Sequence, residues 1–303
     1  MNRTITLSSF GEEFFRKWKC YKKNISNREI KEWLICSDYC IDAKSKNDTL
    51  TFTIFPSNLR FKIFKETKQI LTQDMKHITN ISKEVLDYLK NNKECFSIGI
   101  ILRNKKLFVH NLNEMSKHLH AQIEDYKTMP EDLQKQKKEE HRLIVDFVNY
   151  IDSKKCDKKL VSYFFLVMQT VAFIMEFLII RENANSIYWI SDRDKIISFD
   201  DGVIYYLLNA LVFLLVKERK KDYKIGLFPF EELQHFDSIL RIPDIITGTL
   251  SSISSKNGAV FAEKEKHRDV FRDVIYNNPR IFLMYYIWDK IKGHQEFVIL
   301  NHP

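Results

Sequence analysis

Hydrophobic and polar residues alternate along several short stretches of the chain, and this pattern predicts β-strands. Thr49–Phe55 (TLTFTIF) places threonine and apolar residues in turn, as a half-buried strand does. A polar segment, Ala43–Asp48, separates it from the apolar run Trp33–Cys36, so we expect these two strands to form an antiparallel hairpin. Further short apolar runs predict strands at Phe96–Leu102, Ile187–Ser191 and Lys224–Phe228.

Longer amphipathic or apolar segments between these strands predict helices. Pro243 is typical of a first helical turn and predicts a helix from there to about Ser254. Other helices are expected at about Leu59–Lys90, Asn111–Lys127, Glu131–Ile151, Leu160–Ile180, Asp200–Lys221 and Phe261–Lys292. The order predicts an α/β fold with a mixed sheet of about five strands covered by helices, and with extra helices at both termini.

The same pattern predicts how the domains are organised. Residues 1–31 form a basic helical cap, and residues 32–255 form the main domain, with a helical insertion at about 111–182. Residues 256–303 form a helical extension that ends in an aromatic-rich helix, IFLMYYIWDKI. Such a helix predicts a surface for a homo-oligomer or a protein partner.

One helix is long and apolar enough to raise the question of a membrane. Leu160–Ile180 could cross a bilayer by length, and lysines precede it. A strand signal follows this segment closely, which argues against a membrane span. Polar residues inside the segment are also costly in lipid: Ser162, Gln169, Thr170 and Glu176. We therefore expect a buried central helix, with a membrane-associated protein as the alternative.

Charge and cysteine content narrow the class of protein. The net charge is +8 with 48 basic residues, which suits a polyanionic partner such as nucleic acid, although lysine-rich helices are also common as solvated faces. The five cysteines include no CxxC pair, which favours the reducing cytoplasm. The N-terminus has no continuous apolar core, so we expect no signal peptide.

Acidic residues follow the ends of the expected strands. Asp38 follows the first strand, Asp192 and Asp194 follow the fourth, and Asp244 lies near the start of the helix after the fifth. The carboxyl ends of strands in an open α/β sheet are where ligands bind. Clustered carboxylates favour a hard cation, Mg²⁺ or Mn²⁺, and two such ions can cleave a phosphodiester with water as the nucleophile. Arg193 could bind a phosphate or pair with its acidic neighbours.

With these motifs, the chain resembles an RNase H-like bacterial family of unknown function. Members of that family carry Asp-Glu-Ser-Gly after the first strand, an Asp-x-Arg triplet after a later strand, and Asp-Ser followed by Gln-Leu-Ala-Asp-x-x-x-Gly. The corresponding stretches here are SDYC with Asp38, SDRD with Asp192, and Asp237-Ser238 followed by RIPDIITG with Asp244 and Gly248. The resemblance covers roughly residues 32–255.

The resemblance implies an RNase H-like sheet and a metal-dependent nuclease. Asp38, Asp192 and Asp244 would be catalytic and would bind the metal, with Asp194 as a further ligand. Glu176 would be an auxiliary acid, although satisfied burial also explains it. Tyr39 stands where the family has glutamate, and Asp42, Asp194 or Asp201 could supply the missing acid. The alternative is an inactive relative that binds nucleic acid or protein in a bacterial defence or mobile-element system.

Overall fold

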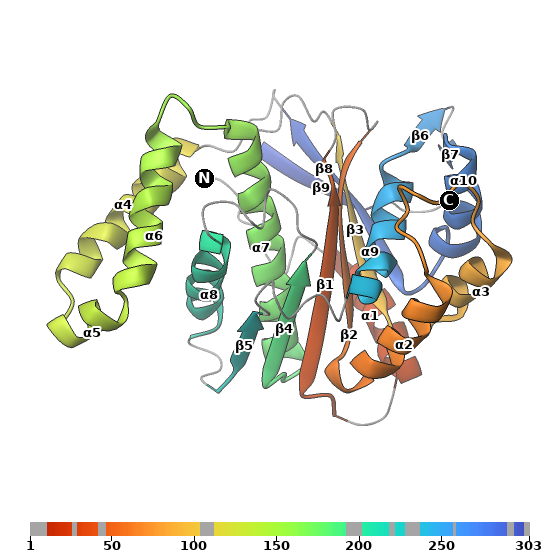
Figure 1. The fold of residues 1–303 in the computed structure, drawn as a ribbon, viewed down its shortest axis with the longest axis horizontal. Helices are drawn as coiled ribbons and strands as arrows, with labels where there is room; N and C mark the ends of the chain where they lie inside the picture. The colour runs from red at the N-terminus through yellow and green to blue at the C-terminus, as the bar shows by residue number, and fades with distance from the viewer. Residues whose placement is uncertain are drawn as a thin grey trace. The chain divides into compact units, whose positions relative to one another are not determined.

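The structure is a computed structural model of the whole chain. It describes residues 11–25, 29–41, 47–103, 112–191, 202–217, 222–227, 237–256, 259–289 and 294–299. These residues form two compact units (Figure 1). One unit comprises residues 1–105, 177–192 and 219–303, and the other comprises residues 106–176 and 193–218, so the boundary crosses one long helix.

The first unit contains a seven-stranded mixed sheet with helices packed on it. The α/β fold class expected from the sequence is confirmed. The strand order of the sheet is β5-β4-β1-β2-β3-β8-β9, compatible with an RNase H-like sheet. The pairs β1/β4, β4/β5 and β3/β8 are parallel, whereas β1/β2, β2/β3 and β8/β9 are antiparallel. The strands are β1 (Glu32–Cys40), β2 (Asp48–Pro56), β3 (Phe96–Arg103), β4 (Ser186–Ser191), β5 (Lys224–Leu227), β8 (Ile281–Asp289) and β9 (His294–Ile299).

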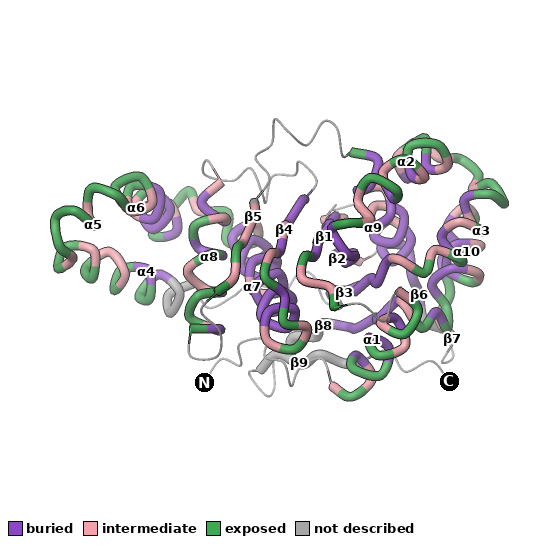
Figure 2. Tube along the Cα trace, turned by 90° about the horizontal axis from the view of Figure 1, so that it is seen from below, coloured by how far each residue is buried: buried purple, intermediate pink, exposed green. Residues whose placement is uncertain are grey.

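The expected hairpin of β1 and β2 is present, and helices cover both faces of the sheet around it. On one face, α9 (Asp237–Leu250) packs across β1, β2 and β3. On the other face, α1 (Gly11–Ile25) buries Phe14 and Trp18, whose rings contact those of Trp33 and Phe96. Figure 2 shows β1 and β2 buried along most of their length, as strands enclosed on both faces must be.

Further short elements complete the layer around α9. They are a 3-10 turn (Ser57–Leu59), α2 (Arg60–Ile70), α3 (Lys83–Asn91), a two-stranded sheet of β6 (Ile253–Lys256) and β7 (Ala259–Ala262), α10 (Glu265–Asp269) and a π-helical turn (Val270–Ile275). The helical region expected at about Leu59–Lys90 consists of two helices, α2 and α3, separated by an irregular segment, residues 71–82.

Helices alone form the described part of the second unit: α4 (Leu112–Lys127), α5 (Glu131–Gln136), α6 (Lys138–Asp152), most of α7 (Lys158–Arg181) and α8 (Val203–Val216). α4 packs on α6 and α6 on α8. α7 has the length and composition of a membrane span, and 89% of its most apolar window is buried in the structure. This burial agrees with the expected central helix.

Two expectations for the C-terminal half of the chain are wrong. The aromatic stretch expected as an interface helix is strand β8, which pairs with β3. Ile281–Tyr285 are all buried, and an uninterrupted apolar run of this length has no periodicity that separates helix from strand. The second expectation placed Pro243 in the first turn of its helix. α9 begins at Asp237, six residues before the proline, so Pro243 lies in the interior of the helix.

Candidate functional site

Asp38 lies near the carboxyl end of β1, in the middle of the sheet. It pairs with Thr51 of the antiparallel neighbour β2. On its other side, β1 runs parallel to β4, and the last pair along this ladder joins Ser37 to Ser191. Ser37 and Ser191 immediately precede Asp38 and Asp192 in the chain, so the register aligns the residues that lead into the two acidic motifs.

The side chain of Asp38 belongs to the face of the sheet that α9 covers. Leu34 and Cys36, which precede it at alternate positions of β1, are in the same core cluster as the isoleucines of α9. Side chains alternate between faces along a strand, so Asp38 continues this face. Ile190 of β4, the partner of Cys36, lies in this core too. Asp38 is buried, with 7% of its surface exposed.

Two threonine hydroxyl groups fix α9 against the sheet at this point. The Thr247 hydroxyl donates to the backbone carbonyl of Asp38 at 3.2 Å, and the Thr49 hydroxyl donates to the carbonyl of Thr247 at 3.1 Å. Both threonines are fully buried. Buried polar groups require such partners, so these bonds hold the helix in one register over β1 and β2.

Thr51, the strand partner of Asp38, has a buried hydroxyl oxygen without a hydrogen-bond partner among the described residues. Its side chain faces the same side of the sheet as that of Asp38, because directly paired residues share a face. An unpaired buried hydroxyl costs about 1–3 kcal/mol, so this oxygen is a candidate to interact with something bound beside Asp38.

On the opposite face, a hydrogen-bond network joins the ends of β1 and β4. The indole nitrogen of Trp189 donates to the Ser37 hydroxyl at 2.9 Å, and the Ser37 and Tyr39 hydroxyls are 2.6 Å apart. The Ser191 hydroxyl also bonds to that of Tyr39, at 3.1 Å. The network fixes the register of the two strands up to the residue before Asp192. It also gives Tyr39 a structural role.

The acids of the third motif are located on α9. Asp237 is exposed in the first turn, whereas Ser238 is buried and its hydroxyl donates to the carbonyl of Phe64 on α2 at 3.3 Å. One carboxylate oxygen of Asp244 accepts a hydrogen bond from the backbone N–H of Met75 at 2.6 Å. Gly248, one turn later, faces the same residue, because a Cβ at Gly248 would lie 2.9 Å from Met75 Cγ. This end of the motif therefore holds the segment around Met75 against α9.

Two cations hold the same segment, residues 71–82. The guanidinium of Arg241 donates to the carbonyl of Leu71. The ammonium of Lys266 donates to the carbonyls of Met75 and Ile78, both at 2.8 Å. Burial lowers the pKa of Lys266, and Asp244 acts in the opposite direction. These contacts give Arg241 a structural role at this segment.

The remaining candidate residues are less informative. Asp42, Asp192, Arg193, Asp194 and Asp201 lie outside the described residues. Glu176 is buried on α7 and belongs to the second unit, whereas Asp38 belongs to the first. Within the described part of the chain, no group of three or more histidine, cysteine, aspartate or glutamate side chains is arranged to hold a metal ion.

Sequence reasoning missed the threonines around Asp38. The alternation in TLTFTIF placed Thr49 and Thr51 on one face of β2, but nothing in it indicated that this face would carry Asp38. Thr247 was hidden for a similar reason, because its role depends on how α9 crosses the strands.

No protein-family model, curated protein or solved structure matches the chain.

Proposed function

We propose that the chain is a metal-dependent, nuclease-like protein whose site lies at the carboxyl ends of β1 and β4. The observation that carries this proposal is the parallel register that aligns Ser37 with Ser191. In this proposal, Asp38 and Asp192 bind Mg²⁺ or Mn²⁺, and Asp194 is a further ligand. The position agrees with the general rule that ligands bind at the carboxyl ends of strands in open α/β sheets.

The donors beside Asp38 suit a hard cation. A carboxylate and the buried Thr51 hydroxyl provide oxygen only, which favours Mg²⁺ or Mn²⁺ over zinc. A bound divalent ion would activate water and stabilise the negative charge that develops at a phosphodiester. The chain's own contribution is to fix the position of Asp38, which the Thr247 bond and the network at Ser37 and Tyr39 do on its two sides.

The net charge of +8 supports nucleic acid as the substrate. A phosphate backbone is attracted by lysine and arginine whatever its base sequence, and neutralising it releases counterions. We therefore expect binding of the substrate to weaken as the salt concentration rises. RNA and DNA share this backbone charge, so both belong in the test.

A second candidate is an inactive relative that binds nucleic acid or protein without cleaving it. The observation that favours it is the bond between the carboxylate of Asp244 and the N–H of Met75. An acid that holds a backbone segment has one oxygen fewer for a metal. In this reading, the third motif has a structural function and the pair at Asp38 and Asp192 lacks a third catalytic acid.

The nuclease and the inactive relative differ in whether the chain cleaves nucleic acid. The purified full chain would be incubated with labelled single-stranded DNA, duplex DNA and RNA in the presence of Mn²⁺, alongside Asp38→Asn and Asp192→Asn. The matched control is Asp222→Asn, because Asp222 is an exposed aspartate in the same unit. The nuclease proposal requires wild type and control to cleave while both site variants lose cleavage by at least roughly a hundredfold.

Binding measurements complete this experiment. Mn²⁺ affinity would be measured by calorimetry, and nucleic-acid affinity by fluorescence anisotropy at several salt concentrations. Nucleic-acid binding without cleavage in wild type supports the inactive relative. Equal cleavage by wild type and Asp192→Asn refutes the nuclease site proposed here.

A further inference from the structure

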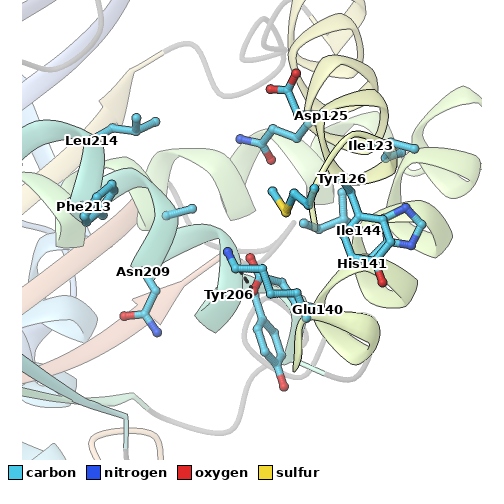
Figure 3. A pocket seen from close by; sticks show the side chains of 14 residues that line it. Ile123, Asp125, Tyr126, Glu140, His141, Ile144, Tyr206, Asn209, Phe213 and Leu214 are labelled. Carbon is cyan, nitrogen blue, oxygen red and sulfur yellow. Dashed lines mark ion pairs between the residues drawn. The ribbon is translucent and has the colours of Figure 1, made fainter. Parts of the chain in front are cut away.

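The second unit contains a cavity of about 530 Å³ between its helices, and the proposed nuclease site does not account for it. Figure 3 shows side chains of α8 on one side of the hollow, including Phe213 and Leu214, and side chains of α4 and α6 on the other, including Tyr126 and Ile144. Small-molecule sites typically have volumes of about 300–1,000 Å³ and often lie between helices. The cavity therefore has the size of a ligand site.

The α8 side of the cavity exposes large apolar side chains. Phe213 is 58% exposed, Leu214 is 53% exposed and Tyr206 is 37% exposed, and all three line the cavity. The opposite face of α8 is buried, including Leu208, Val212 and Val216. Apolar surface gathered on the wall of a concave site favours an occupant with an apolar body, because its binding removes this surface from water.

The charged groups of the lining favour a cation. Asp125 of α4 is exposed and makes no ion pair among the described residues. The other two charged lining residues, Lys137 and Glu140, lie 3.8 Å apart and offset each other. One negative charge therefore remains at the cavity.

Aromatic rings in the wall act in the same direction as Asp125. Tyr126 lines the cavity from α4, and Tyr206 and Phe213 line it from α8. The faces of aromatic rings carry partial negative charge and attract ammonium groups at short range. Tyr126 is held in place by His141, another lining residue, because the two rings stack with 3.8 Å between centroids.

From these observations we propose that the cavity binds a small organic ammonium ion with an aromatic or branched apolar body. The apolar body packs against Phe213, Leu214 and Ile144, and the ammonium group lies toward Asp125 and the tyrosine rings. This proposal does not depend on the nuclease proposal, because all lining residues belong to the second unit.

The test compares two probes of similar size and opposite charge: phenethylammonium and 3-phenylpropionate. Binding to the full chain would be measured by calorimetry and by ligand-observed NMR. We expect phenethylammonium to bind more tightly, and Asp125→Asn to weaken it by roughly two- to fivefold, the range for an exposed ion pair. Asp132→Asn is the matched control, because Asp132 is exposed on α5 and does not line the cavity.

Two further variants test the location. Ala210→Trp fills the cavity from α8 and should abolish binding, whereas Ala121→Trp, at an exposed position of α4 outside the lining, should not. If Ala210→Trp does not fold, Phe213→Ala serves instead, because that side chain is more than half exposed. Phe213→Ala should weaken phenethylammonium binding while leaving the helical circular dichroism unchanged.

The outcomes separate clearly. Equal affinity of wild type for the two probes overturns the choice of a cation. Binding that persists unchanged in Ala210→Trp, or in Phe213→Ala, overturns the location. Absence of binding of phenethylammonium at millimolar concentration overturns the proposal as a whole.

Discussion

Replacing Asp244 with alanine should lower the free energy of unfolding by about 2 kcal/mol, because the carboxylate of Asp244 holds the N–H of Met75 at 2.6 Å. Met75 is 2% exposed, so its N–H is shielded from water once the acceptor is removed. Leaving a buried donor unpaired costs about 1–3 kcal/mol, and the lost bond had a charged acceptor, which places the expected value in the upper part of that range.

The informative comparison is with Asp244→Asn. Asparagine keeps a side-chain oxygen that accepts the same hydrogen bond, so the loss of stability should be below about 1 kcal/mol. A metal ligand behaves differently, because asparagine removes the negative charge that a hard cation requires. If Asp244 acts only as the acceptor for Met75, Asp244→Asn preserves both stability and Mn²⁺ affinity.

Urea unfolding followed by circular dichroism measures the change in stability, and calorimetry measures the affinity for Mn²⁺. Asp87→Ala is the control, because Asp87 is an exposed aspartate on α3 and its loss should change the midpoint little. The reasoning is refuted if Asp244→Asn destabilises as much as Asp244→Ala. A loss of Mn²⁺ binding in Asp244→Asn at unchanged stability would instead assign Asp244 to the metal site.

Two other predictions concern buried ionisable groups. Lys17→Met should lower the free energy of unfolding in urea by about 2–3 kcal/mol, because the buried ammonium donates to the carbonyls of Asn278 and Ile281 at 2.9 and 2.7 Å. Lys19 is exposed on the same helix, so Lys19→Met should have little effect. Equal losses of stability in the two variants would contradict this role of Lys17. Burial, followed by Lys266 and Lys264, lowers the pKa of His267 from 6.5 to about 4, so the unfolded chain binds more protons between these values. Stability should therefore fall by roughly 2–3 kcal/mol from pH 6.5 toward pH 4, and a pH profile of His267→Gln as steep as that of wild type would refute this.

The sequence was sufficient to predict the strands around Asp38, because each combines an apolar pattern with polar ends. β1 to β4 and the hairpin of β1 and β2 have such signals, and the short apolar run at β5 is bounded on both sides by polar or proline residues. By contrast, β8 has apolar residues at every position of its buried part, and only its pairing with β3 decides that it is a strand. Tertiary pairing carries this information, and no local pattern contains it.

The candidate site was predictable in part. The position of Asp38 at the end of β1 followed from the pattern of the strand, and the register that aligns Ser37 of β1 with Ser191 of β4 required the structure. The role of Asp244 was not predictable, because its partner Met75 lies 169 residues earlier in a segment that has no regular structure. The cavity in the second unit was also hidden, since α8 is apolar on both sides and its sequence does not show which side remains exposed.

The pairing of β8 with β3 has a consequence for how the chain is made. Roughly 180 residues separate the two strands, and at about 5–20 residues per second a ribosome needs on the order of 10–40 s to span them. During that time the outer edge of β3 lacks its partner and can pair with another chain. α1 is synthesised before β3 but also lacks its partners during this time, because the carbonyls that hold Lys17 belong to Asn278 and Ile281. We therefore expect nascent chains that stop before β8 to aggregate or to recruit chaperones, because β3 is synthesised long before the strand that pairs with it.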